Sequence, residues 1–217
     1  MIKDKPLPDS LLRFGGKVLS WFIKKKFKKI ILNEIDIKAN HSYLLMCNHF
    51  SFWDGLLACF IVVNAIDKKQ RLKGMKIMVL EKQMEMNKWL KYIGCFSIAP
   101  KSIRAKESLD YAIDILNETG NVLIIFPQGN LESMFIRYIK FKDGITSIIP
   151  HVKVNCQLIW SSNFIEFFEG LKPRVYLNML DAGTNSDFDF ERLKSDVNAH
   201  HLSSMKKNFR FTEEPKN

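Results

Sequence analysis

Short apolar runs alternate along the chain with longer stretches in which apolar residues recur every three or four positions. The short runs are typical of buried strands, and the longer pattern is typical of helices that pack one face on a sheet. The predicted strands cover residues 43–47, 77–80, 95–98, 121–126, 157–166 and 174–180. The predicted helices cover residues 55–66, 84–92, 102–118, 144–152 and 188–208, with a loop at 181–187. Strands and helices that alternate with short connections predict an α/β fold, a mainly parallel sheet flanked by helices.

The amino-terminal residues carry a different pattern. Apolar residues recur at helical spacing from Leu11 to Ile23, and lysines crowd around them, most densely from Lys24 to Lys29. A basic amphipathic helix is typical of a segment that lies in a membrane interface, and the lysine cluster favours that interpretation. The alternative is a surface helix that packs its apolar stripe on the domain. We therefore expect a membrane-interface segment at residues 1–32 and one α/β domain at residues 33–210.

The amino-acid composition limits the classes of partner that we expect for this chain. The net charge of +10 favours an anionic partner, and no nucleic-acid recognition module is visible, so we expect an anionic membrane surface and no nucleic acid. The four cysteines lie far apart without a Cys-x-x-Cys pair, and are expected to be buried apolar residues rather than ligands of a metal. The longest apolar stretch, residues 55–66, is too short to span a bilayer, so we expect a peripheral protein. His200 and His201 fall in a predicted exposed helix, and no role is assigned to them.

The candidate chemistry lies where the first predicted strand ends. Residues 48–54 read Asn-His-Phe-Ser-Phe-Trp-Asp, which places His49 five positions before Asp54. An imidazole titrates near neutral pH, and a carboxylate on its other ring nitrogen fixes the tautomer and stabilises the imidazolium. We therefore predict that His49 is a general base oriented by Asp54, at the carboxyl edge of the sheet. The alternative is a core histidine in a turn, with Asp54 as the N-cap of the next helix.

A second break in the pattern follows the strand at 121–126, where Pro127 and Gly129 let the backbone approach a ligand. Together the segments at 48–54 and 126–131 resemble the motifs of the glycerol-phosphate and lysophospholipid acyltransferase family. The family's first motif, Asn-His-x-Ser-x-x-Asp, is matched at every fixed position by Asn48, His49, Ser51 and Asp54. Its third, Phe-Pro-Glu-Gly-Thr-Arg, is matched by Phe126, Pro127 and Gly129, with Gln128, Asn130 and Leu131 at the other positions.

The resemblance implies an acyltransferase-like fold and transfer of a fatty acyl chain from acyl-CoA or acyl carrier protein to a hydroxyl or amine of a lipid-like acceptor. It implies His49 and Asp54 as catalytic residues, with no cofactor or metal. The residues that it implies at the substrate site are Asn48, Ser51, Lys82, Phe126, Pro127, Gln128, Gly129 and Asn130. Backbone amides of the turn at 49–54, or Lys82, are the candidates to hold the oxyanion. The Ser51 hydroxyl is expected to stabilise the turn rather than to act as a nucleophile.

The departures from the family pattern concern the acceptor. The family's second motif is a glycine and a short strand that ends in Asp-Arg, and residues 94–100 keep the glycine and the strand but end in Pro100. In the family, the arginines of the second and third motifs hold the acceptor phosphate, and Pro100 and Leu131 stand in their places here. The basic residues near these positions are Lys101, Arg104 and Arg137. We therefore expect an acceptor other than glycerol 3-phosphate or lysophosphatidic acid, used at the cytoplasmic face of a membrane. The alternatives are a 1-acylglycerol-3-phosphate acyltransferase of phospholipid synthesis, a thioesterase, and a catalytically silent membrane-surface protein.

Overall fold

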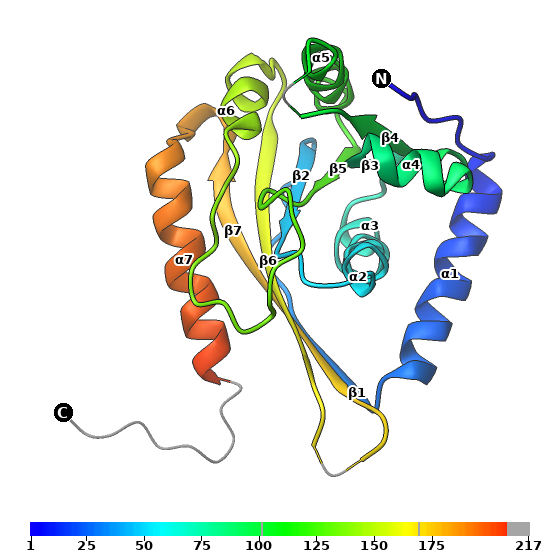
Figure 1. The fold of residues 1–217 in the computed structure, drawn as a ribbon, viewed down its shortest axis with the longest axis vertical. Helices are drawn as coiled ribbons and strands as arrows, with labels where there is room; N and C mark the ends of the chain where they lie inside the picture. Colours follow the sequence, from blue (N-terminus) through cyan, green and yellow to red (C-terminus); the bar gives the residue numbers. More distant parts are fainter. Residues whose placement is uncertain (101, 169, 208–217) are drawn as a thin grey trace.

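The computed structural model describes residues 1–100, 102–168 and 170–207. It contains a seven-stranded sheet with the strand order β1-β7-β6-β2-β5-β3-β4 (Figure 1). The strands are β1 (Lys29–Asn33), β2 (Ser42–Cys47), β3 (Gly74–Leu80), β4 (Cys95–Ile98), β5 (Asn121–Ile125), β6 (Cys156–Glu166) and β7 (Arg174–Thr184). The β6–β7 pair is antiparallel and the other pairs are parallel. The predicted mainly parallel sheet is therefore confirmed.

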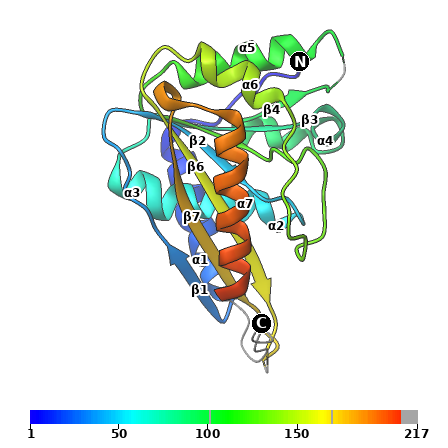
Figure 2. The ribbon, with the colours of Figure 1, turned by 90° about the vertical axis from the view of Figure 1, so that its left-hand side faces the viewer.

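Helices cover both faces of this sheet. The helices are α1 (Asp9–Lys26), α2 (Trp53–Ile61), α3 (Asp67–Lys69), α4 (Glu81–Met86), α5 (Ala105–Leu116), α6 (Gly144–Ile148) and α7 (Phe190–Lys207). A π-helical turn at Val62–Ile66 joins α2 to α3, which makes one long helical segment where a buried helix was predicted. Helices α1 and α2 lie on one face, and α5, α6 and α7 lie on the other, with α7 running along β6 and β7 (Figures 1 and 2).

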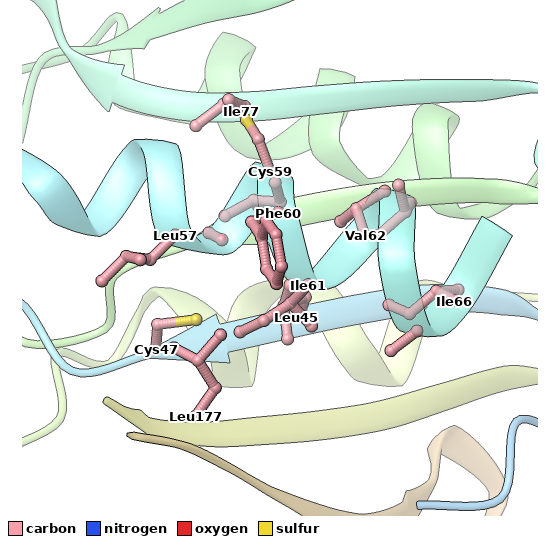
Figure 3. Packing of buried hydrophobic residues seen from close by; sticks show 14 of the residues in the cluster. Leu45, Cys47, Leu57, Cys59, Phe60, Ile61, Val62, Ile66, Ile77 and Leu177 are labelled. Carbon is pink, nitrogen blue, oxygen red and sulfur yellow. The ribbon is translucent and has the colours of Figure 1, made fainter. Parts of the chain in front are cut away.

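Strand β2 is the centre of the molecule because it is buried on both faces. Tyr43, Leu45 and Cys47 point into the core beneath α2, whereas Leu44 and Met46 point into the core beneath α5 and α6. Figure 3 shows the first of these cores, in which side chains of α2 and the π-helical turn meet Leu45, Cys47, Ile77 and Leu177 from the sheet. An apolar run without alternation is therefore what a strand buried on both faces requires.

The four cysteines are buried in these two cores, as predicted. Burial raises the pKa of the Cys59 thiol to about 12 and that of the Cys156 thiol to about 11. Burial also raises the pKa of the thiols of Cys47 and Cys95. A thiol with a raised pKa stays protonated at neutral pH, so these side chains serve as small apolar core residues.

Several elements differ from the prediction. The helix predicted at 84–92 is interrupted at Asn87, whose backbone leaves the helical region, and a 3₁₀ turn at Lys88–Ile93 follows. The loop predicted at 181–187 is wrong in its first half, because β7 continues to Thr184 in pairing with β6 and a 3₁₀ turn follows. Strand β1 was not predicted. It pairs with β7, so the sheet includes residues before the expected boundary at 33. Residue 208, where the predicted carboxyl-terminal helix ends, and residues 209–210 of the predicted domain lie outside the described residues.

The predicted exposure of His200 and His201 is wrong. His201 is fully buried, with Nε2 3.2 Å from the Ile136 carbonyl oxygen and Nδ1 3.0 Å from Ser162 Oγ. Because a carbonyl oxygen can only accept, Nε2 carries the hydrogen and Nδ1 accepts from the Ser162 hydroxyl. Burial lowers the His201 pKa to about 4, which keeps the ring neutral. His200 is half-buried and contacts the Asn178 carbonyl oxygen. His201 therefore joins α7 to β6 as a structural residue.

Candidate active site

The two sequence motifs meet at one edge of the sheet. His49 follows β2 and Phe126 follows β5, and these two strands are parallel neighbours, so their carboxyl ends lie side by side. The His49 and Phe126 rings stack with their centroids 4.6 Å apart and an interplanar angle of 27°. The fold thus brings together two segments that are far apart in the sequence, at the edge where α/β proteins carry their sites.

His49 and Asp54 form a direct pair. Nδ1 of His49 lies 2.7 Å from Oδ2 of Asp54, whose side chain has no exposed surface, whereas the His49 side chain is 28% exposed. Since a carboxylate can only accept, Nδ1 carries the hydrogen and Nε2 has a free lone pair. Nε2 has no hydrogen-bond partner within the part of the chain that the structure describes. This geometry is that of an oriented base that can take a proton from a substrate.

Asp54 also holds the turn that carries His49. Its Oδ2 accepts the backbone N–H groups of Phe50 at 2.6 Å and Ser51 at 2.8 Å, and its Oδ1 accepts the Ser51 hydroxyl at 3.3 Å. The helix N-cap is Phe52, so the alternative interpretation of Asp54 as that cap is wrong. Ser51 Oγ accepts the backbone N–H of Trp53 at 3.1 Å. The Ser51 hydroxyl is therefore committed to the turn, in line with the role expected for it.

These hydrogen bonds reduce the number of backbone amides in the turn that are free to hold an oxyanion. The N–H groups of Phe50 and Ser51 donate to Asp54, that of His49 donates to Gln128, and that of Trp53 donates to Ser51. The Asp54 N–H donates to the Ser51 carbonyl oxygen at 3.2 Å. Among the described hydrogen bonds of this turn, the amide of Phe52 is the one without an acceptor. Most of the turn amides proposed from the sequence are thus already occupied.

Gln128 and Glu132 hold the main chain of His49 from the other side. Gln128 is almost fully buried, and its Oε1 accepts the His49 N–H at 2.7 Å. Its Nε2 donates to the Glu132 carboxylate, and the Glu132 N–H donates to the His49 carbonyl oxygen at 2.9 Å. Both peptide groups of His49 are therefore fixed by the segment after β5. Glu132 was missed in the sequence because its partners, the Gln128 side-chain amide and the His49 carbonyl oxygen, are polar groups that no periodic pattern indicates.

Asn48 is oriented away from this pair, toward β6. Its Nδ2 donates to the Asn163 carbonyl oxygen at 3.0 Å, and its Oδ1 accepts the Asn163 N–H at 2.7 Å. Both ends of the amide are used in this way, and the side chain is buried. Asn48 therefore anchors the start of the turn that carries His49 to the neighbouring strand, and its contact with substrate stays a prediction.

The remaining predicted site residues divide into two groups. The Pro127 carbonyl accepts the Lys142 N–H at 2.8 Å, and Gly129 has φ = +70°, a conformation that favours glycine, so both shape the loop. Lys82 and Asn130 are exposed, with no side-chain hydrogen bond or ion pair to any described residue. Lys82 lies in the first turn of α4, directly after β3, and β3 is separated from β2 by β5. Their substrate contacts stay predictions.

Two of the three basic residues near the missing arginines lie in the described part of the chain. Arg104 pairs with Glu81 through two hydrogen bonds of 3.2 and 3.0 Å, at a mostly exposed position. Arg137 is exposed. Lys101 lies outside the described residues. Within the described part of the chain, no group of three or more His, Cys, Asp or Glu side chains is placed to hold a metal ion.

Exchanging the two members of the Gln128–Glu132 pair tests its role. We expect Gln128→Glu to lower kcat/KM about tenfold, because two adjacent carboxylates repel by about 1.4 kcal/mol and displace the His49 main chain. We expect Glu132→Gln to cost less, since an amide oxygen still accepts from Gln128. The double variant should recover most of the activity, because the carboxylate and the amide have only changed places. Strictly additive losses in this double-mutant cycle would mean that the two side chains act separately.

Comparison with known proteins places this fold and site in a family. The family model described as Acyltransferase matches residues 29–160, which run from the start of β1 into β6 and include both motifs. The chain belongs to this acyltransferase family, and its resemblance to the glycerol-phosphate and lysophospholipid acyltransferases is confirmed.

A solved structure shows the same fold. The crystal structure of the 1-acyl-sn-glycerophosphate (LPA) acyltransferase PlsC from Thermotoga maritima is similar with a TM-score of 0.62 and 16% identity, over 94% of this chain and 84% of that chain. No curated protein sequence matches the chain. None of the helices that the structure describes is long and apolar enough to pass through a bilayer.

Proposed function

We propose that this acyltransferase moves a fatty acyl chain from the thioester of acyl-CoA or acyl carrier protein to a hydroxyl or amine of a lipid-like acceptor. The observation that carries the proposal is the His49–Asp54 pair, in which Nδ1 is held by a buried carboxylate and Nε2 is free. Membership of the acyltransferase family supports the reaction class.

In the proposed reaction, Nε2 of His49 takes the proton of the acceptor group as its oxygen or nitrogen attacks the thioester carbonyl carbon. Asp54 stabilises the imidazolium that forms. The carbonyl oxygen becomes negatively charged in the tetrahedral intermediate, and the amide of Phe52 and the Lys82 side chain are the candidate donors to it. The carbon–sulfur bond then breaks, and the thiolate leaves with the proton from His49. The balance is one acyl group transferred and one free thiol released.

The acceptor is the part of the proposal that departs from PlsC. A phosphate buried beside the base needs fixed cations, because an unpaired buried charge costs several kcal/mol. Arg104 is already paired with Glu81, and Leu131 occupies the position of the arginine in the third motif. We therefore propose an acceptor whose reacting group does not lie next to a phosphate. Because PlsC is a 1-acyl-sn-glycerophosphate (LPA) acyltransferase, lysophosphatidic acid is the alternative acceptor.

A panel of acceptors tests this proposal. The protein is incubated with labelled palmitoyl-CoA or palmitoyl acyl carrier protein, and products are identified by lipid mass spectrometry. The acceptors are glycerol 3-phosphate, lysophosphatidic acid, uncharged lipid alcohols and amine-bearing lipids. We expect transfer to an uncharged or amine acceptor at least about tenfold faster than to either phosphate, which corresponds to about 1.4 kcal/mol.

The panel also separates the alternatives. Efficient transfer to lysophosphatidic acid that is lost in Arg104→Gln or Arg137→Gln would overturn the acceptor proposal and favour phospholipid synthesis. Acyl release to water at the same rate with and without acceptors would identify a thioesterase instead. No turnover with any donor and acceptor, in a protein that remains folded, would favour a catalytically silent surface protein.

A further inference from the structure

Helix α1 has two apolar faces. Leu19 and Ile23 face the domain, where they join the core beneath α2, which agrees with the packing alternative considered from the sequence. A second stripe of large apolar side chains is exposed along the same helix. Its members are Leu11, Phe14, Val18, Trp21 and Phe22. Apart from the contact of Phe22 with Trp53, this stripe stays largely exposed within the described part of the chain, so packing on the domain accounts for Leu19 and Ile23 but not for the stripe.

The exposed stripe runs into an apolar groove at its carboxyl-terminal end. Phe22 stacks on Trp53, with ring centroids 6.3 Å apart, and Trp53 lines a groove of about 580 Å³. The same groove is lined by Phe50 and Ser51 of the catalytic turn. It therefore lies directly beside the turn that carries His49.

Three exposed apolar side chains stand around this groove. Phe135 belongs to the loop after β5, and Phe167 and Leu171 belong to the tip of the β6–β7 hairpin. Their exposed fractions are 72%, 63% and 99%. Figure 1 shows the hairpin and the end of α1 together at the lower end of the molecule, and Figure 2 agrees. We call Phe135, Phe167 and Leu171 the rim.

The charged side chains around the groove indicate which kind of surface covers the rim. Lys25, Lys26 and Lys172 line the same groove, against one acidic residue, Glu166. The Lys25 ammonium lies 4.4 Å from the centroid of the Trp21 ring, and Lys172 Nζ donates to the Lys25 carbonyl oxygen at 3.0 Å. Apolar side chains flanked by lysines match an anionic lipid surface, where the chains enter the acyl region and the ammonium groups meet the headgroups.

We propose that the rim, together with the carboxyl-terminal end of α1, is the surface that docks this protein on an anionic bilayer. Phe135, Phe167 and Leu171 enter the lipid, and the groove beside the catalytic turn then opens into it. A lipid acceptor reaches His49 from the bilayer without crossing water. Delivery of the acceptor to His49 rests on the proposed function, whereas docking on the bilayer depends only on the side chains of this surface.

Sedimentation with vesicles tests the docking on the full chain. The vesicles are phosphatidylcholine with 30% phosphatidylglycerol, and pure phosphatidylcholine serves for comparison. We expect Phe167→Ser with Leu171→Ser to lower the partition coefficient for the anionic vesicles at least tenfold. Ile103→Ser is the matched control, because Ile103 is 98% exposed before α5, and it should stay within twofold of the unmodified protein.

A second pair of variants tests the charges. Lys25→Gln with Lys172→Gln should weaken binding about tenfold at low salt and make binding less sensitive to salt than in the unmodified protein, because screening acts on the attraction that these two charges supply. Lys106→Gln with Lys153→Gln removes the same charge from exposed positions elsewhere and should change binding less than twofold. Thermal unfolding of each variant shows that it remains folded.

The outcomes separate this inference from the proposed function. His49→Gln, which removes the base, should bind vesicles like the unmodified protein. Binding of the hairpin variant within twofold of the unmodified protein would overturn the docking surface even if acyl transfer is established. So would a dimer, seen by sedimentation velocity, that the hairpin substitutions dissociate, because the rim would then cover a second copy. Vesicle binding lost in the hairpin variant, in a protein that transfers no acyl group, would retain the docking and reject the enzyme.

Discussion

Replacement of His49 by glutamine should lower acyl transfer by about a thousandfold, while the protein remains folded. A positioned general base contributes factors of this order, and glutamine has no group that takes a proton at neutral pH. Stability should change little, since the His49 side chain is partly exposed and a glutamine amide can still donate to Asp54. The measurements are kcat/KM with a soluble thioester donor and the midpoint of thermal unfolding.

The result is informative in both directions. A variant with normal unfolding and no transfer assigns the loss to chemistry rather than to structure. A variant that keeps full activity would mean that His49 is not the base, and the His49–Asp54 pair would then have a structural role only.

Replacement of Asp54 by alanine should have the opposite balance, with a smaller loss of activity and a larger loss of stability. The buried carboxylate accepts the His49 ring N–H and the backbone N–H groups of Phe50 and Ser51. Removal leaves these donors without an acceptor, and we expect the free energy of unfolding to fall by about 2–4 kcal/mol. Activity should fall about a hundredfold, because an unheld imidazole keeps some basicity.

Asp54→Asn is the matched comparison. The amide oxygen can still accept the two backbone N–H groups, so most of the stability should return. The amide nitrogen is a donor, however, and would favour the wrong tautomer of His49, so activity should stay low. Urea unfolding and kcat/KM of both variants provide the test. Equal stability of the alanine variant and the unmodified protein would show that the turn does not depend on Asp54.

The sequence predicts those parts of the fold that depend on residues close together in the chain, such as an apolar run or a short motif. β2 and β5 are uninterrupted apolar runs because they are buried on both faces, and the parallel arrangement then brings His49 and Phe126 to one edge. The Asn-His-x-Ser-x-x-Asp pattern is local in the same sense, because Asp54 reaches back to His49, Phe50 and Ser51 within one turn.

The parts that were missed depend on partners distant in the sequence. β1 is a short strand that begins with a lysine and gains its place by pairing with β7, so the local pattern does not distinguish it from the basic amino-terminal segment. The Asn48–Asn163 bonds and the Gln128–His49 bond likewise join distant positions through polar atoms. His201 is buried in a polar stretch because Ser162 and the Ile136 carbonyl satisfy both ring nitrogens. Hydrophobic periodicity carries no signal for such contacts.

The burial of the cysteines determines how the reaction can be followed in real time. Colorimetric disulfide reagents count thiols by reacting with thiolates, and the four cysteines of the folded chain are both inaccessible and, with raised pKa values, protonated. The native protein therefore contributes almost no background to such a measurement. Every thiol that appears during turnover of a thioester donor then comes from the donor, and a thiol signal from the protein itself reports unfolding.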